Sequence, residues 1–178
     1  MNLILLAAGN GKRMKSNLPK VLHEICGRSM ICRVLDLTQK LKNLNTTIVV
    51  QKDHNLIKEN INKHIDGRKV FHFAVQNEQL GTGDAVKSAL NHLDNSLFTL
   101  ILYGDVPLIE FKTLKLLCAN LDSNLDIRIL TANVIDPKGY GRVIRNKKRQ
   151  IIEIIEEKDA NSEERNIKEV FAGPLLIK

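Results

Sequence analysis

The first residues that could do chemistry form a loop that combines glycines with positive charges. Residues 8–13 (AGNGKR) follow a short apolar segment at residues 2–7, and Lys20 comes shortly afterwards. Glycines let backbone N–H groups approach an anion closely, and several cations in one loop suit a triphosphate better than a phosphodiester. The alternative is a glycine turn whose basic side chains are only solvated.

The spacing of this loop matches neither of two common phosphate-binding motifs. Met14 occupies the place of the third glycine in the dinucleotide fingerprint, and no serine or threonine follows Lys12 as the Walker A motif requires. The pair Lys12 and Arg13 stands in place of those features. The loop therefore predicts an anion site that uses side-chain charge.

A single carboxylate follows the most apolar segment of the chain. Residues 97–103 (LFTLILY) predict a strand that is buried on both faces, and Gly104 and Asp105 come directly after it. Mg²⁺ usually takes one or two protein carboxylates and completes its shell with water and phosphate oxygens. We therefore predict that Asp105 binds the metal. A turn or helix-cap role fits less well, because the next helix is expected only at residues 110–121.

A third candidate loop is rich in amide side chains. Residues 76–83 (QNEQLGTG) lie between an expected strand and an expected helix. An amide presents a donor and an acceptor together, which matches the edge of a nucleobase, and Gly81 would let a backbone group reach that base. The alternative is an ordinary polar loop in which Thr82 caps the helix.

Strand-like and helix-like segments alternate through the first two thirds of the chain, which is typical of an α/β fold with a mostly parallel sheet and flanking helices. The expected strands are residues 2–7, 46–51, 69–75 and 97–103. The expected helices are residues 29–42, a segment capped by Asp53, residues 82–93 and residues 110–121. In the second helix, the residues expected to face inward are Leu56, Ile57, Ile61 and Ile65. In the third they are Ala85, Val86, Ala89, Leu90 and Leu93, and in the fourth Phe111, Leu114, Leu117, Cys118 and Leu121.

The last third of the chain changes character. Residues 127–134, 141–145, 150–156 and 169–177 predict strands without long helices between them. This strand-rich extension could form an extra sheet or an antiparallel continuation of the core. Ligands of open α/β sheets bind at the carboxyl ends of the strands. The site is therefore expected where residues 9–20, 76–83 and 104–107 meet.

The composition is that of an ordinary soluble domain. The chain has 178 residues, of which 43% are hydrophobic and 26% charged, enough for one domain with a real core. A net charge of +7 and a pI near 9.4 fit a phosphate-rich small substrate, nucleic acid, or a lysine-rich solvated surface. Two tyrosines, five phenylalanines and no tryptophan argue against a nucleic-acid partner.

Other classes of site receive little support. Five scattered histidines show no zinc-binding spacing, and three cysteines form neither a CxxC pair nor a complete disulfide framework. The apolar segment 3–8 is too short for a signal-peptide core or a membrane span. We expect a cytoplasmic protein with no membrane partner.

Five collinear segments together resemble the sugar nucleotidyltransferase family, and within it the N-acetylglucosamine-1-phosphate uridyltransferases. The segments are LAAGNGKRMKSNLPKVLH, QNEQLGTGDA, YGDVPL, DPKGYGRV and IEEKDA, spread over residues 6 to about 160. The resemblance implies a Rossmann-like fold of the nucleotide-diphospho-sugar transferase type. It also implies the activity: uridylyl transfer from UTP to N-acetylglucosamine-1-phosphate with Mg²⁺, for peptidoglycan and lipopolysaccharide precursors.

The resemblance also assigns roles to matching positions. Arg13 and Lys20 correspond to the catalytic cations, and Asp105 to the magnesium ligand. The nucleotide-binding positions are Leu6, Ala7, Ala8, Gly9, Gly11, Gln76, Gly81 and Thr82, of which Gln76, Gly81 and Thr82 read uracil. The sugar-binding positions are Tyr103, Gly104, Gly141 and Glu156.

The chain departs from the family's pattern near its end. Phe171 stands where the family has an asparagine that binds the sugar, so that hydrogen bond cannot form. We expect a single pyrophosphorylase domain over residues 1–178 that stops before the family's second metal-binding asparagine, without the left-handed β-helix acetyltransferase domain. A fragment and a naturally short homologue both fit. Alternative functions are another sugar-1-phosphate nucleotidyltransferase and a non-catalytic pyrophosphorylase-like binding domain.

Overall fold

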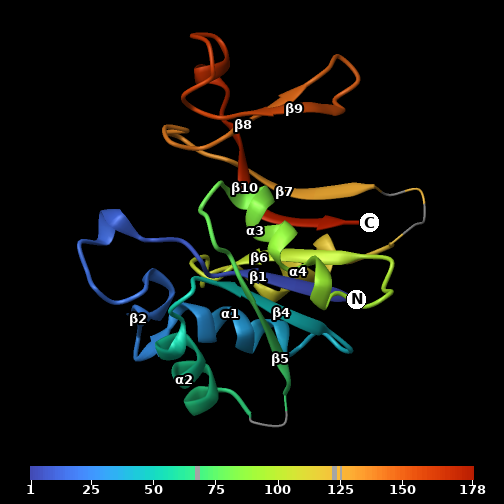
Figure 1. The fold of residues 1–178 in the computed structure, drawn as a ribbon. Helices are drawn as coiled ribbons and strands as arrows, with labels where there is room; N and C mark the ends of the chain where they lie inside the picture. Colours follow the sequence, from blue (N-terminus) through green and yellow to red (C-terminus); the bar gives the residue numbers. More distant parts are fainter. Residues whose placement is uncertain (67–68, 122–123, 125) are drawn as a thin grey trace.

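The computed structural model describes residues 1–66, 69–121, 124 and 126–178, and of Lys12 it describes the backbone only. Four parallel strands form the centre of the fold (Figure 1): β1 (Asn2–Leu6), β4 (Asn45–Val50), β5 (Phe71–Val75) and β6 (Thr99–Tyr103), in the order β5-β4-β1-β6. The expected mostly parallel sheet is confirmed.

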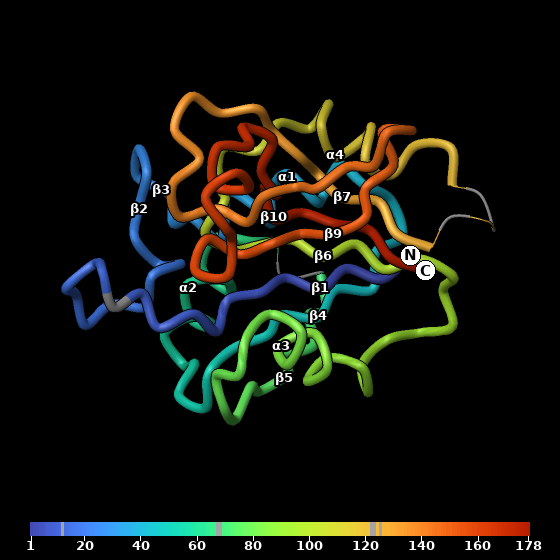
Figure 2. Tube along the Cα trace, turned by 90° about the horizontal axis from the view of Figure 1, so that it is seen from above, coloured from blue at the N-terminus to red at the C-terminus, as the bar shows by residue number. Residues whose placement is uncertain are grey.

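Helices cover both faces of this parallel core. Alternate residues of each strand point to opposite faces, so Leu3 and Leu5 join one buried cluster while Ile4 joins another. The first cluster includes side chains of α1 (Met30–Thr38), α2 (Asn55–His64) and α4 (Phe111–Leu117), and the second those of α3 (Thr82–Ser88). Figure 2 shows α3 on the opposite side of the strands from α1 and α4. Burial on both faces explains why the central strands β1 and β6 are mostly apolar.

Several details of the expected helices were wrong. The helix α2 begins at Asn55 after His54, so Asp53 is not its cap, and Leu56 is 54% exposed while Ile57, Ile61 and Ile65 are buried. Residues four apart on a helix share one face, and Leu56 lies off that line. The helices α1, α3 and α4 also end earlier than the expected residues 42, 93 and 121, at Thr38, Ser88 and Leu117. A 3₁₀ turn, η3 (Leu90–His92), follows α3 and leaves Leu90 exposed, and Leu121 is exposed beyond the end of α4.

The strand-rich extension continues the central sheet in an antiparallel manner. The long strand β10 (Glu169–Ile177) pairs antiparallel with β6, with β7 (Ile127–Asn133) and with β8 (Arg142–Arg145), and β8 pairs with β9 (Ile151–Ile155). Of the two expected arrangements, the antiparallel continuation is the one observed. Because β10 contacts both the core and the outer strands, it joins them into one sheet (Figure 1).

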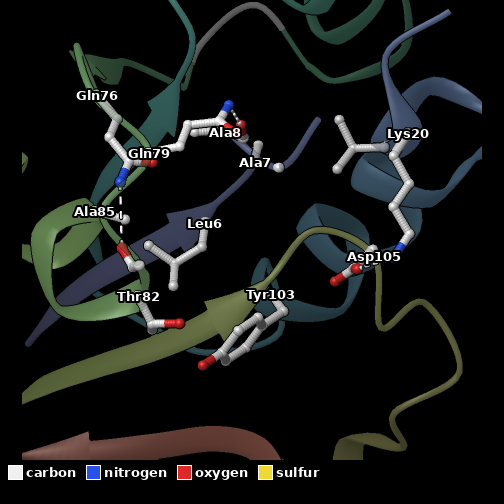
Figure 3. A pocket seen from close by; sticks show the side chains of 13 residues that line it. Leu6, Ala7, Ala8, Lys20, Gln76, Gln79, Thr82, Ala85, Tyr103 and Asp105 are labelled. Carbon is white, nitrogen blue, oxygen red and sulfur yellow. Dashed lines mark hydrogen bonds and ion pairs between the residues drawn. The ribbon is translucent and has the colours of Figure 1, made fainter. Parts of the chain in front are cut away.

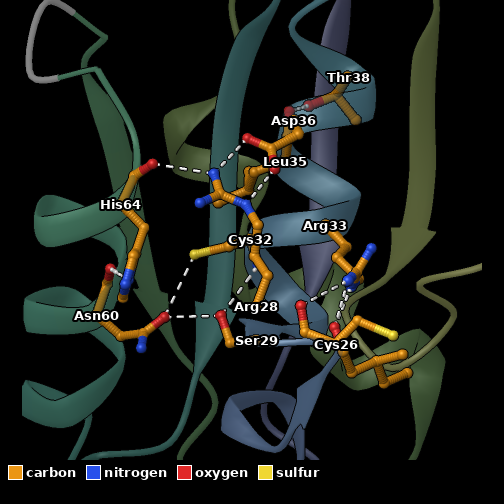
Figure 4. A network of polar contacts seen from close by, with 11 residues as sticks. Cys26, Arg28, Ser29, Cys32, Arg33, Leu35, Asp36, Thr38, Asn60 and His64 are labelled. Atoms are coloured by element: carbon orange, nitrogen blue, oxygen red, sulfur yellow. Dashed lines mark hydrogen bonds and ion pairs between the residues drawn. The ribbon is translucent and has the colours of Figure 1, made fainter.

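The segment between β1 and α1 is held by a polar network (Figure 4). It contains the 3₁₀ turns η1 (Lys12–Met14) and η2 (Lys20–Leu22) and a hairpin of β2 (Glu24–Ile25) and β3 (Arg28–Ser29). Arg28 forms two hydrogen bonds with the carboxylate of Asp36 in α1, and its Nη2 also donates to the His64 carbonyl of α2 at 2.9 Å. The segment that carries Lys20 is therefore anchored to two helices.

None of the described helices has the length and apolar character that crossing a bilayer requires.

A buried arginine fastens the turn that leads into β8. The Arg142 side chain is 1% exposed, and its Nη2 lies 2.6 Å from a carboxylate oxygen of Glu157 and 3.3 Å from the Arg165 carbonyl. Its Nη1 donates to the Tyr140 carbonyl. The hydrogen bond from Arg142 is the main cause that lowers the pKa of Glu157, helped by the backbone N–H of Gly139. These bonds fix the segment from Gly139 to Arg142 against the end of β9.

We predict that Arg142→Met lowers the free energy of unfolding at pH 7 by about 1–3 kcal/mol, because two carbonyls lose their donors. The pKa of Glu157 is depressed in the folded state, so its ion pair stabilises the fold above the unfolded pKa and is lost as pH falls through the folded value. In urea titrations from pH 7 to pH 3, the difference between wild type and Arg142→Met should shrink below the ordinary carboxyl pKa of 4.5.

Glu157→Gln is the matched variant for this pH dependence. It removes the titrating group but keeps an acceptor for Arg142, so the same acid-dependent part of the stability should be absent. A constant difference between wild type and Arg142→Met over the whole range would refute the assigned ion-pair contribution.

Candidate nucleotide-binding site

A pocket of about 290 Å³ opens at the carboxyl ends of β1 and β6 (Figure 3). Each of the three loops expected to form the site contributes to its wall. The lining residues are Leu6, Ala7, Ala8, Gly9, Lys20, Val21, Gln76, Gln79, Gly81, Thr82, Ala85, Tyr103 and Asp105. The structure thus brings together most of the positions that the sequence singled out.

The loops meet because hydrogen bonds continue the sheet past the ends of its strands. The N–H of Ala7 donates to the Val49 carbonyl at 2.8 Å, and the N–H of Gly104 donates to the Leu6 carbonyl at 2.8 Å. On the outer strand, the N–H of Gln76 donates to Val50 at 2.9 Å. The three loops therefore begin side by side at the carboxyl ends of the parallel strands.

The expected catalytic cation and the expected metal ligand form an ion pair on the pocket wall. The Nζ of Lys20 lies 2.5 Å from Oδ2 of Asp105, and the two side chains are 35% and 29% exposed. Lys20 comes from the segment after β1, and Asp105 from the turn after β6. Two opposite charges from distant parts of the sequence thus converge at the mouth of the pocket, where polyphosphate oxygens would bind.

The donor set at Asp105 fits a metal that is bound together with a phosphate. No group of three or more histidine, cysteine, aspartate or glutamate side chains among the described residues could hold a metal by itself. Asp105 offers one partly exposed carboxylate to the pocket. Mg²⁺ commonly binds one or two protein carboxylates and takes its remaining ligands from water and phosphate, so this set suits it.

Gly11 and Arg13 lie outside the pocket wall. Gly11 has a φ of +57°, and a Cβ atom there would come within 2.8 Å of the Lys20 Cβ. Its small size therefore lets the loop pass Lys20 closely. Arg13 is exposed in η1, with no hydrogen bond or ion pair to any described residue. The side chain of Lys12, the other expected cation, lies outside the described part of the chain.

The wall opposite Lys20 carries the amide-rich loop. Gln76 is 7% exposed, and its Nε2 donates to the Gly81 carbonyl at 3.2 Å and to Oδ2 of Asp84 at 2.9 Å. Gly81, with a φ of +115°, is the N-cap of α3, so the alternative in which Thr82 caps this helix was wrong. Gln76, Gly81 and Thr82 all line the pocket.

Tyr103 connects the pocket with the outer strands. Burial raises the pKa of its phenol; a hydrogen bond with Thr82 opposes this, and the carboxylates of Asp105 and Glu156 add to it. A Cβ atom on Gly173, which has a φ of +100°, would lie 3.3 Å from the Tyr103 ring. The bend in β10 therefore packs against this ring.

The other expected sugar-binding residues, Gly104, Gly141 and Glu156, do not line the pocket. A Cβ atom on Gly104 would lie 3.1 Å from Val21 and 3.2 Å from the Leu6 carbonyl, so Gly104 allows close packing behind the wall. A Cβ atom on Gly141 would lie 3.0 Å from Ile154 and 3.6 Å from Oε1 of Glu156. Gly141 and Glu156 are thus neighbours, and the charge of Glu156 reaches Tyr103.

Phe171, which is expected to stand where the family has a sugar-binding asparagine, is half-buried in β10. Its N–H donates to the Gly141 carbonyl at 2.9 Å. The backbone at this position is therefore beside Gly141.

Three amide side chains that the sequence did not single out individually brace the glycine loop. The Nε2 atoms of Gln51 and Gln79 both donate to the Ala8 carbonyl, at 2.8 and 2.9 Å. Asn10 accepts from Gln51 at 2.7 Å and donates to Gln79, so it joins the two glutamines. Gln51 directly follows β4, and attention to every strand end would have found it.

Comparison with known proteins identifies the family of this chain. The family model of the MobA-like NTP transferase domain matches residues 3–166. The chain is 40% identical to bifunctional protein GlmU of Clostridioides difficile, over 96% of this chain and 36% of that protein. It is 43% identical to bifunctional protein GlmU of Cupriavidus necator, over 99% of this chain and 37% of that protein. The chain thus spans little more than a third of these relatives.

Solved structures with the same fold include HddC from Yersinia pseudotuberculosis, with a TM-score of 0.73, 20% identity, and 99% of this chain and 76% of that chain covered. The inositol-1-phosphate CTP transferase from T. maritima has a TM-score of 0.73 at 17% identity, with 99% and 70% covered. These likenesses confirm the expected Rossmann-like fold class, and the family match confirms a nucleotidyltransferase. The chain therefore belongs to the MobA-like NTP transferase domain family, in which it matches the amino-terminal domain of GlmU proteins.

Proposed function

We propose that this chain transfers the uridylyl group of UTP to N-acetylglucosamine-1-phosphate and releases pyrophosphate. The observation that carries the proposal is the convergence of Lys20 and Asp105 at the mouth of a pocket whose opposite wall presents Gln76. Such a site offers charge to a polyphosphate at one end and amide hydrogen bonds to a base at the other. The 40–43% identity to proteins named GlmU supports the same substrates.

The proposed reaction is an in-line attack by a phosphate oxygen of the sugar phosphate on the α-phosphorus of UTP. That oxygen is already anionic near neutral pH, so the reaction needs no general base. Lys20 would hold phosphate oxygens and oppose the charge that develops during transfer, and Asp105 would hold Mg²⁺. When bound, Mg²⁺ supplies charge neutralisation at the phosphates.

The sugar would lie on the side of the pocket that faces the outer strands. Tyr103 forms the wall there, and Glu156 lies beside Gly141 within electrostatic reach of Tyr103. A carboxylate can accept hydrogen bonds from sugar hydroxyls, which gives Glu156 a binding role. Arg13 is exposed on the turn that follows Gly11, and we propose that it contacts the triphosphate when substrate is bound.

UDP-N-acetylglucosamine is a precursor of peptidoglycan and lipopolysaccharide. We therefore place the proposed activity in the cytoplasm, where both substrates are available, with no membrane or nucleic-acid partner.

The proposed function predicts a particular substrate preference. Pyrophosphate release should require magnesium and should be fastest with UTP and N-acetylglucosamine-1-phosphate, because the base and the sugar phosphate are bound at separate ends of the pocket. The measurement compares the four nucleoside triphosphates, each with N-acetylglucosamine-1-phosphate and with glucose-1-phosphate, and is repeated on any longer natural form of the protein. Faster turnover with another base or with glucose-1-phosphate would assign the domain to a different sugar nucleotidyltransferase.

Removing a charge at the site should slow catalysis strongly. We expect Asp105→Asn and Arg13→Ala each to lower kcat/KM by about 10²–10³-fold, the usual effect of losing one well-placed charge contact to the transition state. Asp159→Asn is the matched control, because Asp159 is 64% exposed and paired only weakly with Lys158 at 4.0 Å. Near-normal turnover of Asp105→Asn at limiting magnesium would contradict the metal assignment.

A further inference from the structure

The amide of Gln76 is held in one orientation by its surroundings. Both hydrogens of Nε2 are used, one by the Gly81 carbonyl at 3.2 Å and one by the carboxylate of Asp84 at 2.9 Å. Figure 3 shows the amide nitrogen turned to its dashed hydrogen bond and the oxygen turned away from it. That oxygen, Oε1, has no hydrogen-bond partner in the described part of the chain, and Gln76 lines the pocket.

The opposite orientation is electrostatically unfavourable. An ionised carboxylate has only acceptors, and so has a carbonyl oxygen. Rotating the amide by half a turn would place Oε1 against the Asp84 carboxylate and the Gly81 carbonyl. None of these oxygens carries a hydrogen, so no hydrogen bond could form between them. Gln76 is 7% exposed, so water could compensate this contact only poorly. Asp84, in the first turn of α3, is the charged member of the two acceptors and makes the shorter hydrogen bond, so it contributes most to which end of the amide faces the ligand.

The fixed orientation has a consequence for the base that the pocket accepts. An acceptor that faces the Watson–Crick edge of a base needs a ring N–H opposite it. Uracil has such a donor at N3, whereas N3 of cytosine and N1 of adenine carry lone pairs. We propose that Asp84 determines selection of uracil over cytosine, acting as a positioning residue that orients Gln76. This inference rests on the proposed binding of a uridine nucleotide.

The test compares the affinities of UDP and CDP by titration calorimetry, which requires no turnover. Asp84→Asn keeps the size of the side chain but adds an N–H₂ donor, which can pair with the reversed Gln76 amide. Only the longer hydrogen bond to the Gly81 carbonyl then still favours the original orientation. We expect wild type to prefer UDP and Asp84→Asn to lower the UDP-to-CDP affinity ratio by about tenfold, the effect of one misplaced hydrogen bond.

Ser88→Ala is the matched control for damage to the helix. The Ser88 hydroxyl donates to the backbone carbonyl of Asp84 at 3.0 Å, so its removal changes a contact of Asp84 within the same helix without touching the Gln76 amide. The affinity ratio should be unchanged in this variant. Should Asp84→Asn fail to fold by circular dichroism, Asp84→Ser provides the same test, because a hydroxyl can also donate or accept.

Two results would overturn the inference. One is an equal loss of UDP and CDP affinity in Asp84→Asn, which would mean that Asp84 only supports the helix. The other is a wild-type protein without a preference between the two nucleotides. The same measurements distinguish this inference from the proposed reaction. A UDP preference that depends on Asp84, without pyrophosphate release, would refute only the proposed reaction. Normal UTP turnover, with an affinity ratio unchanged by Asp84→Asn, would refute only the role of Asp84.

Discussion

The alignment of parallel strand ends is the constraint on which the site depends. Hydrogen bonds from Ala7 to Val49 and from Gly104 to Leu6 extend the strand register into the loops. Loops about a hundred positions apart in the sequence therefore begin side by side. A backbone hydrogen bond at the edge of a buried sheet is costly to lose, since the freed group would remain partly shielded from water. The position of Lys20 beside Asp105 follows from this alignment and from the polar anchoring of the η2 segment.

The pocket combines a rigid end with a charged end. Around the glycine loop, Asn10, Gln51 and Gln79 satisfy one another and the Ala8 carbonyl, which limits movement of the loop backbone. At the other end, Lys20 and Asp105 neutralise each other. A polyanion that brings a cation offers each of these two groups a new partner of opposite charge, so binding need not leave either charge unpaired.

The outer strands are joined to the site through the bend in β10. Gly173 allows this strand to pass close to the Tyr103 ring, and Phe171 binds the backbone of Gly141. The buried Arg142 holds the neighbouring turn in place. The region proposed to bind sugar is therefore an antiparallel attachment to the parallel core. Phe171 lies in this attachment.

The sequence by itself determined the order of the elements, the parallel core and the three loops of the site, because apolar runs, helical periodicity and strand-end glycines are local signals. Tertiary structure decided the ends of the helices, the exposure of Leu56 and the attachment of β10 to β6, since these depend on which neighbours supply burial. It also decided that Asp84 fixes the orientation of Gln76. That contact joins a loop residue after β5 with a residue of α3, and neither residue type specifies its partner without the fold.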